Sequence, residues 1–171
     1  RCRQPIPSVT RSSDCCAGSR RGWAVDVSTA TLDRAGAGRD CLPFTAPFLL
    51  APMEGVTDAC FRDLVLARNA ATALGGAFTE FVRVSEVPTP HHVLQRHLGP
   101  QRFEAPVGLQ LMGSDLAKLA ATAQSAVECG APLVDLNFGC PAKGALRGCA
   151  GSALLADPAA LERVVRAVAL A

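Results

Sequence analysis

The sequence predicts an α/β fold in which short buried strands alternate with helices along the chain. Apolar runs of strand length occupy residues 48–51, 78–84, 106–112 and 133–137. Helix signals follow them, in residues 58–68, in a short irregular stretch within 86–100, in 116–129, and from 158 to the end. Strands that alternate with helices in this way form a parallel sheet.

Composition limits the class of protein. The chain has 171 residues, of which 49% are hydrophobic, and this is enough for one domain with a core. The net charge of +2 neither requires nor excludes a nucleic-acid partner. No apolar run reaches the roughly 18 residues that a membrane span needs, so no membrane partner is expected. Eight cysteines at irregular spacing, without a CxxC pair, indicate reduced thiols in a cytoplasmic protein, with no metal.

Residues 1–46 differ from the rest of the chain. Arg, Ser, Gly and Cys are scattered there without a helical or strand period, and only residues 23–27 have strand character. We expect an irregular leader that is disordered or spurious, and a transit-like segment is the alternative. The adjacent Cys15 and Cys16 leave a metal or redox site open as a further alternative.

The first half of the ordered region begins with a strand at residues 48–51. Thr57 or Asp58 is expected to cap a helix that runs to about Arg68, with an apolar face of Cys60, Phe61, Leu64 and Val65. Residues 78–84 alternate apolar and polar side chains, which predicts one half-buried strand.

The second half repeats the pattern twice. Residues 106–112 form a strand, Asp115 caps the helix that follows, and Gly130 ends that helix. After the strand at 133–137 and a loop, Asp157 caps the last helix and Pro158 opens it.

Distinctive residues stand at every junction where a strand ends: Pro52, Met53 and Glu54; Glu80 and Arg83; Gln110; Asn137 and Cys140. The active face of a (β/α)8 barrel is built from such positions. A doubly wound sheet is the competing architecture, but neither nucleotide-binding glycine fingerprint is present. Since the sequence supplies only four strands, we expect about the first four β/α units of a TIM barrel.

Cys140 is the strongest candidate for chemistry. The apolar strand before it stops at Gly139, and Pro141 follows the cysteine directly. A thiol at the carboxyl end of a strand is well placed to act on a bound ligand, whereas a buried structural thiol is the alternative. Lys143 and Arg147 are near enough in sequence to meet phosphates, or they face solvent.

Five motifs, in this order, resemble the tRNA-dihydrouridine synthase family: LAPMEGVTD at 50–58, TEFVRV at 79–84, VGLQL at 107–111, VDLNFGCPAK at 134–143 and GSALL at 151–155. The first two resemble most the bacterial tRNA-dihydrouridine(16) synthases, which act on uridine 16 of the D-loop. The resemblance covers about residues 48–171. It implies that residues 47–171 are the N-terminal half of a flavin-binding TIM-barrel domain.

The resemblance implies an FMN-dependent reduction, with NADPH as reductant, of uridine in tRNA to 5,6-dihydrouridine. Cys140 matches the family's general acid, which gives a proton to C5 while the flavin hydride goes to C6. Hydride addition at C6 builds negative charge at C5, and an acid placed there typically accelerates such a step by about 10²–10⁴-fold. An ordinary thiol is protonated at neutral pH and can serve as that acid.

The resemblance also implies roles for six other residues. Pro52, Met53 and Glu54 match the segment that lies against the flavin, and Gln110 matches a residue that hydrogen-bonds the flavin ring. Asn137 matches a residue that holds the uracil, and Arg83 matches a tRNA contact. The residues alone leave an alternative for each role. Residues 52–54 could form an ordinary turn at a strand end, and Gln110 could be a structural amide with its hydrogen bonds satisfied. Asn137 could cap the loop, and Arg83 could be a solvated surface charge.

The chain departs from the family pattern in two ways. Cys149 stands within a run where relatives are rich in glycine, and the later strands that complete the flavin site are absent, so this segment alone should bind FMN weakly. Two other interpretations stay open. One is a dihydroorotate or dihydropyrimidine dehydrogenase, although Gly139 and Ala142 differ from that signature, and the other is a non-catalytic fragment. The oligomeric state is not predicted.

Overall fold

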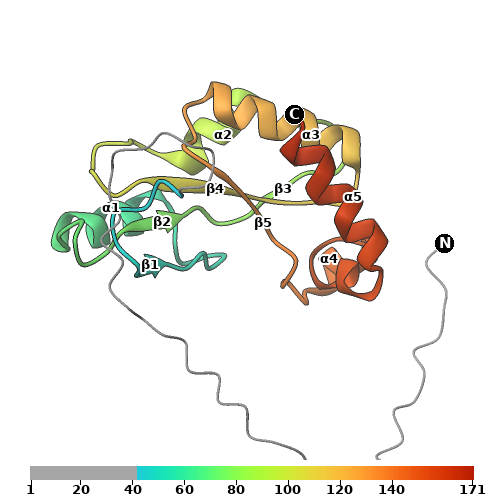
Figure 1. The fold of residues 1–171 in the computed structure, drawn as a ribbon, viewed down its shortest axis with the longest axis horizontal. Coiled ribbons are helices and arrows are strands. Elements are labelled where there is room, and N and C mark those ends of the chain that lie inside the picture. The colour runs from blue at the N-terminus through green and yellow to red at the C-terminus, as the bar shows by residue number, and fades with distance from the viewer. Residues whose placement is uncertain (1–41) are drawn as a thin grey trace, which may run out of the picture. The chain divides into compact units, whose positions relative to one another are not determined.

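The computed structural model describes residues 42–171 (Figure 1). Its strands are β1 (Leu49–Leu50), β2 (Gly76–Phe78), β3 (Val82–Arg83), β4 (Val107–Met112) and β5 (Val134–Leu136). Its helices are α1 (Ala59–Arg68), α2 (His91–Leu98), α3 (Leu116–Glu128), α4 (Lys143–Arg147) and α5 (Pro158–Ala169), with a 3₁₀ helix at Gly151–Ala156. None of the helices in residues 42–171 is long and apolar enough to cross a membrane.

The strands are all parallel; β1, β2, β4 and β5 follow chain order across the sheet, and β3 pairs with the same edge of β4 as β2. β1 pairs with β2, β2 and β3 pair with β4, and β5 also pairs with β4. Backbone hydrogen bonds place β5 on the opposite edge of β4 from β2 and β3. A doubly wound sheet reverses its strand order at a switch point, and no such reversal occurs among the strands described.

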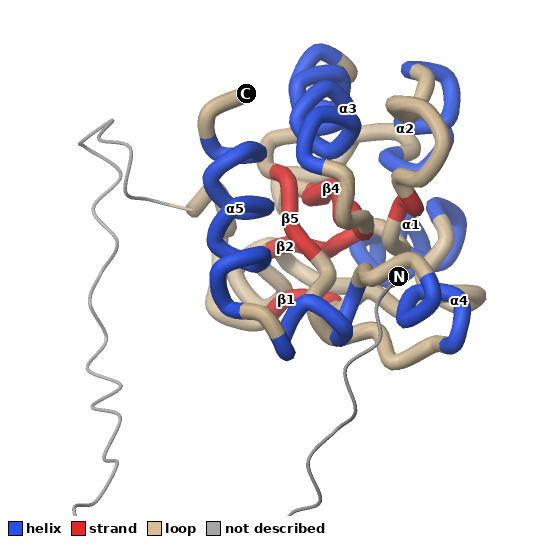
Figure 2. The backbone as a smooth tube through the Cα atoms, turned by 90° about the vertical axis from the view of Figure 1, so that its right-hand side faces the viewer, coloured by secondary structure: helices blue, strands red, loops and turns tan. Residues whose placement is uncertain are grey.

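The helices pack against one another in the same sequence, α1 on α2, α2 on α3, and α3 on α5. Figure 2 shows α5, α3 and α2 in an arc around the strands, from the left through the top to the upper right. The fold is thus a parallel α/β arrangement of TIM-barrel type with four β/α units in the described part of the chain, as the sequence predicts.

The second predicted strand is wrong in one respect, because residues 78–84 form two short strands rather than one. Phe78 pairs with Gly108, and Val82 pairs with Leu111. The chain therefore advances by four residues from Phe78 to Val82 but by only three along β4. One extra residue of this kind is a β-bulge. The Thr79 hydroxyl accepts a hydrogen bond from Gln110 N at 3.0 Å, which replaces a backbone partner at the break.

Strand β4 is buried along its whole length, and its two faces differ. Leu109 and Leu111 pack with Leu94, Leu119 and Ala123 in the main core, between the sheet and the helices. Gln110 lies on the opposite face because side chains alternate along a strand. The helix side of β4 therefore faces the main apolar core, and the other side carries Gln110 together with Met112.

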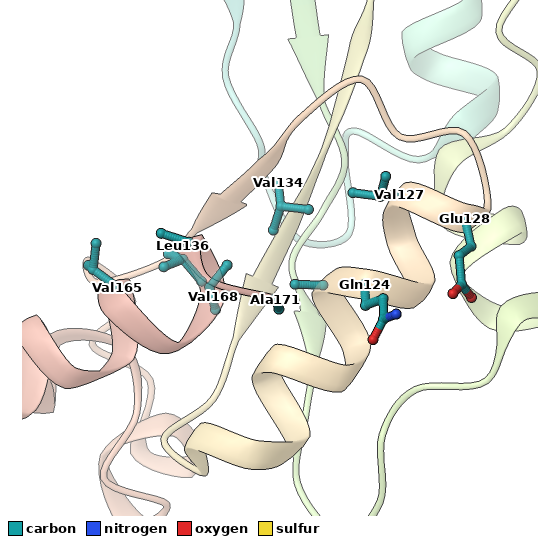
Figure 3. Close-up of a pocket in the computed structure, with 10 residues that line it drawn as sticks. Gln124, Val127, Glu128, Val134, Leu136, Val165, Val168 and Ala171 are labelled. Carbon is teal, nitrogen blue, oxygen red and sulfur yellow. The ribbon is translucent and has the colours of Figure 1, made fainter. Parts of the chain in front are cut away.

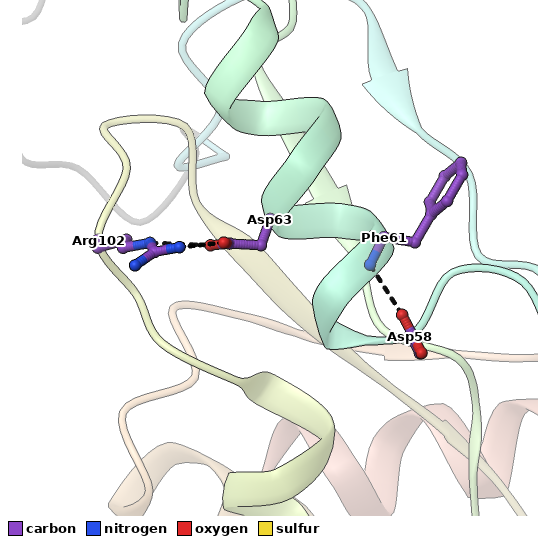
Figure 4. A network of polar contacts seen from close by, with 4 residues as sticks. All are labelled: Asp58, Phe61, Asp63 and Arg102. Carbon is purple, nitrogen blue, oxygen red and sulfur yellow. Dashed lines mark hydrogen bonds and ion pairs between the residues drawn. The ribbon is translucent and has the colours of Figure 1, made fainter.

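The predicted helix caps are confirmed. The carboxylates of Asp58, Asp115 and Asp157 accept from the backbone N–H groups of Phe61, Lys118 and Ala160 at 2.8, 3.1 and 3.0 Å. Figure 4 shows the first of these caps. The expected helix within residues 86–100 is a regular helix, α2.

The compact unit begins at Leu42, several residues before the predicted start at 47. Thr45 donates to the carbonyl of Ala71 at 2.6 Å, and the ring of Phe44 packs edge-on against Phe78. Gly76 makes room for Phe44, since a Cβ at this position would lie 2.6 Å from the ring. The rest of the predicted leader, including Cys15, Cys16 and residues 23–27, lies outside the described residues.

The predicted apolar face of α1 is wrong. Arg62 and Leu66 are the buried residues of this helix, whereas Phe61 and Leu64 are 37% and 54% exposed. Arg62 turns inward because its guanidinium donates to three carbonyls: Thr57 at 2.6 Å, Leu98 at 3.1 Å, and also His97. Burial lowers the pKa of Arg62, against the opposing effect of the Glu80 and Asp58 carboxylates.

Arg62 ties the loop before α1 to the C-terminal end of α2, and its loss would leave these carbonyls unpaired. Arg62→Ala is expected to lower the free energy of unfolding by about 2–4 kcal/mol in urea titrations. Arg102→Ala is the control, because Arg102 is an exposed residue that forms an ion pair with Asp63 (Figure 4) and lies over the ring of the neighbouring Phe103. This control should cost less than about 1 kcal/mol, and equal losses for the two variants would contradict the assignment.

His97 is expected to make the stability of the fold depend on pH. Burial lowers the pKa of His97; the Glu80 carboxylate opposes this shift, and Arg62 and Arg96 reinforce it. The unfolded chain therefore binds more protons than the folded chain just below the ordinary histidine pKa, and stability should fall as the pH drops from about 7.5 to about 5.5. In urea titrations at both pH values, His97→Gln should reduce this fall, whereas the exposed His92→Gln should leave it unchanged. An undiminished fall in the His97 variant would show that another group is responsible.

Candidate active site

The predicted site residues lie at the carboxyl ends of the strands, which share one edge of a parallel sheet. They come from the loop after β1, the end of β3, the inner face of β4 and the loop after β5. Hydrogen bonds from side chains to backbone groups, and one between the side chains of Asn137 and Gln110, connect these and neighbouring segments in pairs. The site is therefore assembled from loops that constrain one another.

The loop after β1 is held by hydrogen bonds within the loop and by one bond to the segment after β2. Thr57, which is fully buried, accepts from Met53 N at 2.8 Å and donates back to Met53 O at 3.1 Å. The carboxylate of Glu80 accepts from Gly55 N and so joins this loop to the end of β2. The side chain of Met53 is 45% exposed on this turn, and Glu54 is also exposed.

Arg83 and Ser114 hold the segment that contains α4. Arg83 donates to the carbonyl of Gly144, and Ser114 donates to the carbonyl of Gly148 at 2.8 Å. A cavity of about 210 Å³ lies between these loops, lined in part by Arg83, Ser114 and Gly148. Arg83 is exposed, so its guanidinium has a structural partner and still faces solvent.

Cys140 is half-buried at the start of the loop after β5. Its side chain packs beside the buried Met112, Ala145 and Ala150. Its carbonyl accepts from both N and Oγ of Ser152, at 3.0 and 3.1 Å. The backbone around the thiol is therefore held on its carbonyl side by the segment that follows α4.

Asn137 holds the other side of this loop. Its side-chain oxygen accepts from Gly139 N at 3.1 Å and from Cys140 N at 2.9 Å. Its side-chain nitrogen donates to Gln110 Oε1 at 2.9 Å. The loop-capping alternative for Asn137 is thus what the geometry shows, and a contact with uracil stays a prediction.

Gln110 is 6% exposed, and both ends of its amide have partners. Its Nε2 donates to Asp135 Oδ2 at 2.6 Å, and its Oε1 accepts from Asn137. Gln110 is therefore satisfied within the protein. An amide nitrogen carries two N–H groups, so one donor remains for a ligand, and the flavin contact stays a prediction.

Sequence reasoning missed the roles of Glu80 and Asp135. Glu80 was visible as a polar residue at a strand end, but its partner is a backbone N–H that sequence does not specify. Asp135 had a clearer signal, since it alternates with the apolar Val134 and Leu136 and shares a face with Asn137.

One cavity lies apart from the predicted site residues. An apolar cavity of about 540 Å³ lies between α3, α5 and the outer face of β5 (Figure 3). Val134 and Leu136 line it, so it opens on the opposite face of the strand from Asp135 and Asn137.

Within residues 42–171, no group of three or more His, Cys, Asp or Glu side chains is placed to hold a metal ion.

The fold and the site together define an α/β segment of barrel type, with a thiol and two amides at the carboxyl edge of its sheet. Residues 49–171 match the dihydrouridine synthase (Dus) family. The chain therefore belongs to the dihydrouridine synthase family. This match favours the tRNA-modifying enzymes over the dihydroorotate and dihydropyrimidine dehydrogenases.

Curated relatives support the same family. The chain is 43% identical over 128 residues to the tRNA-dihydrouridine(16) synthase of Pseudomonas syringae pv. tomato, covering 70% of this chain and 38% of that protein. It is 47% identical over 103 residues to the tRNA-dihydrouridine(16) synthase of Azotobacter vinelandii, covering 55% and 31%. It is 41% identical over 132 residues to a tRNA-dihydrouridine synthase B of Pseudomonas aeruginosa, covering 74% and 39%. The chain thus spans about two fifths of the length of the first and third of these relatives.

The backbone after α4 takes two left-handed conformations. Cys149 has φ +50° and Gly151 has φ +59°. A Cβ on Gly151 would lie 2.6 Å from the Cys140 carbonyl oxygen. The non-glycine residue Cys149 therefore occupies a strained position, and Gly151 makes a close approach to Cys140 that a larger residue would block.

Gly151→Ala should displace the Cys140 loop. A left-handed non-glycine residue costs about 1–2 kcal/mol, and the collision adds to this, so a loss of about 2–4 kcal/mol is expected in urea unfolding. Gly130→Ala is the matched control, because Gly130 has φ +90° but no atom within 4 Å of its added Cβ. If the two variants lost the same stability, the predicted contact with Cys140 would be refuted.

Proposed function

We propose that the protein containing this segment reduces uridine in tRNA to 5,6-dihydrouridine, with FMN as cofactor and NADPH as reductant. The observation that carries the proposal is the placement of Cys140 at the carboxyl end of β5, beside the amides of Asn137 and Gln110. Because the chain spans about two fifths of its relatives, the activity belongs to the longer protein.

The residues present fit a flavin in kind. A flavin ring needs an apolar surface for its face and hydrogen-bonding groups for its polar edge. The half-buried Pro52 and the partly exposed Met53, with the exposed Glu54 beside them, offer an apolar surface. The remaining N–H of Gln110 offers a hydrogen-bond donor for the polar edge. When bound, FMN would supply the hydride that is added at C6 of uracil.

The chain's own contribution is the proton. Cys140 would donate the thiol proton to C5 as negative charge develops there. Asn137 and Ser152 fix the backbone of the cysteine on its N–H and carbonyl sides, which holds the segment that carries the thiol. Asn137 has one side-chain N–H beyond its bond to Gln110, and this donor would hold a uracil carbonyl.

A tRNA substrate fits the charges around the site. Arg83, Lys143 and Arg147 are exposed on the segments next to Cys140, and such cations suit phosphate contacts. The target base must leave the stack to reach the thiol, and a loop uridine does so at least cost. We propose uridine 16 of the D-loop, because the relatives named above include enzymes for that position, and we propose a cytoplasmic location.

A chimera tests the function. Residues 49–171 would replace the matching segment of the Pseudomonas syringae relative, and dihydrouridine at position 16 would be measured by mass spectrometry in tRNA from cells that lack the native enzyme. We expect the modification to be restored. A stable chimera that binds FMN yet forms no dihydrouridine would contradict the proposal.

Cys140→Ala in this chimera should reduce dihydrouridine formation by at least about 10²-fold, because the general acid is lost, while the flavin absorbance of the purified protein is kept. Cys129→Ala is the control, since Cys129 lies at the end of α3, away from the site loops, and should retain full activity. Undiminished turnover in the Cys140 variant would remove this residue from its role.

A further inference from the structure

Asp135 is the first member of a chain of hydrogen bonds that ends at the backbone of Cys140. The Asp135 carboxylate accepts from Gln110 Nε2 at 2.6 Å, and Gln110 Oε1 accepts from Asn137 Nδ2 at 2.9 Å. Asn137 Oδ1 in turn accepts from Cys140 N at 2.9 Å. This chain of hydrogen bonds crosses from β5 to β4 and then returns to the loop that follows β5.

The direction of this chain is set by its two ends. A carboxylate only accepts hydrogen bonds, and a backbone N–H only donates them. Each amide between them can turn over and exchange its oxygen with its nitrogen. With Asp135 at one end and Cys140 N at the other, only one orientation of both amides satisfies every contact.

We propose that Asp135 is a positioning residue that fixes the amide orientations of Gln110 and Asn137 and thereby holds the backbone of Cys140. The inference rests on the proposed function only in that Cys140 is the acid being positioned. Gln110 is 6% exposed, so a reversed amide there could not exchange its lost partners for water at low cost. The same orientation decides which amide groups of Gln110 and Asn137 are left to face a ligand.

The first test is hydrogen exchange in the 171-residue chain, read by mass spectrometry on peptides that resolve Gly139 and Cys140. In the unmodified chain these two amides should be protected. Asp135→Ala frees both side-chain amides to turn, and protection should fall by about tenfold. Asp135→Asn should give a smaller fall, because an amide can still accept from Gln110.

Asp63→Ala is the control, since it removes only the exposed ion pair with Arg102 and should leave Gly139 and Cys140 unchanged. Unprotected amides at Gly139 and Cys140 in the unmodified chain would overturn the proposal, as would unchanged protection in Asp135→Ala.

The second test reverses the chain. Asn137→Asp puts carboxylates at positions 135 and 137. The Gln110 oxygen must then face one of these carboxylates, and both groups are acceptors. The unfolding equilibrium constant should therefore rise by about tenfold or more. Adding Asp135→Asn supplies a donor at position 135. The two side-chain contacts of Gln110 are then satisfied in the opposite direction, while Cys140 N still donates to the side chain at position 137.

The double variant should therefore be more stable than Asn137→Asp alone, although Asp135→Asn destabilises the unmodified chain. Simple packing roles for these residues predict additive losses, and additivity would overturn the proposal. Neither test uses flavin or tRNA, so their outcome is independent of whether the proposed reaction occurs.

Discussion

Pairing along both edges of β4 is the constraint on which the rest of the structure depends. The carbonyls of Gly108 and Met112 accept from Thr79 N and Val84 N on one side, and Leu109 N donates to Leu133 O on the other. These bonds set the register, and the register decides that Leu109 and Leu111 face the helices while Gln110 faces the site. A shift of one residue would place the amide in the apolar core.

The break between β2 and β3 follows from the same constraint. The extra residue between Phe78 and Val82 turns the backbone at the end of β2, where Glu80 reaches Gly55 N. Thr79 supplies the acceptor that Gln110 N would otherwise lose, so this buried N–H is paired despite the bulge. A local irregularity in pairing thus directs one side chain toward the neighbouring loop, as bulges beside functional sites often do.

Regular signals in the sequence were sufficient for much of the fold. Alternation and apolar runs located β4 and β5, and Asp58, Asp115 and Asp157 marked three helix starts, because a cap depends on neighbouring residues only. The bulge after Phe78 and the inward turn of Arg62 were not predictable in this way. Both depend on partners distant in sequence, Gln110 in one case and the end of α2 in the other.

The same distinction applies to the site. Gln110, Asn137 and Cys140 were predicted because they stand at strand ends, and the structure brings them together through direct hydrogen bonds. Their partners were harder to predict. Asp135 could have been found from its alternation with Val134 and Leu136, whereas the bond from Glu80 to a backbone N–H leaves no trace in residue types.

The arginine at position 83 shows why a structural contact and a functional one need not compete. Arg83 donates to the Gly144 carbonyl from one nitrogen of a group that carries five N–H donors in a fixed plane. Because that bond uses a carbonyl near the start of α4, it fixes the guanidinium at the rim of the cavity lined by Ser114 and Gly148. A cation held in this way loses less conformational entropy when it meets a phosphate than one on a mobile side chain. The contact with the Gly144 carbonyl is therefore compatible with the phosphate contact proposed for Arg83, because the guanidinium is held in place and is still exposed.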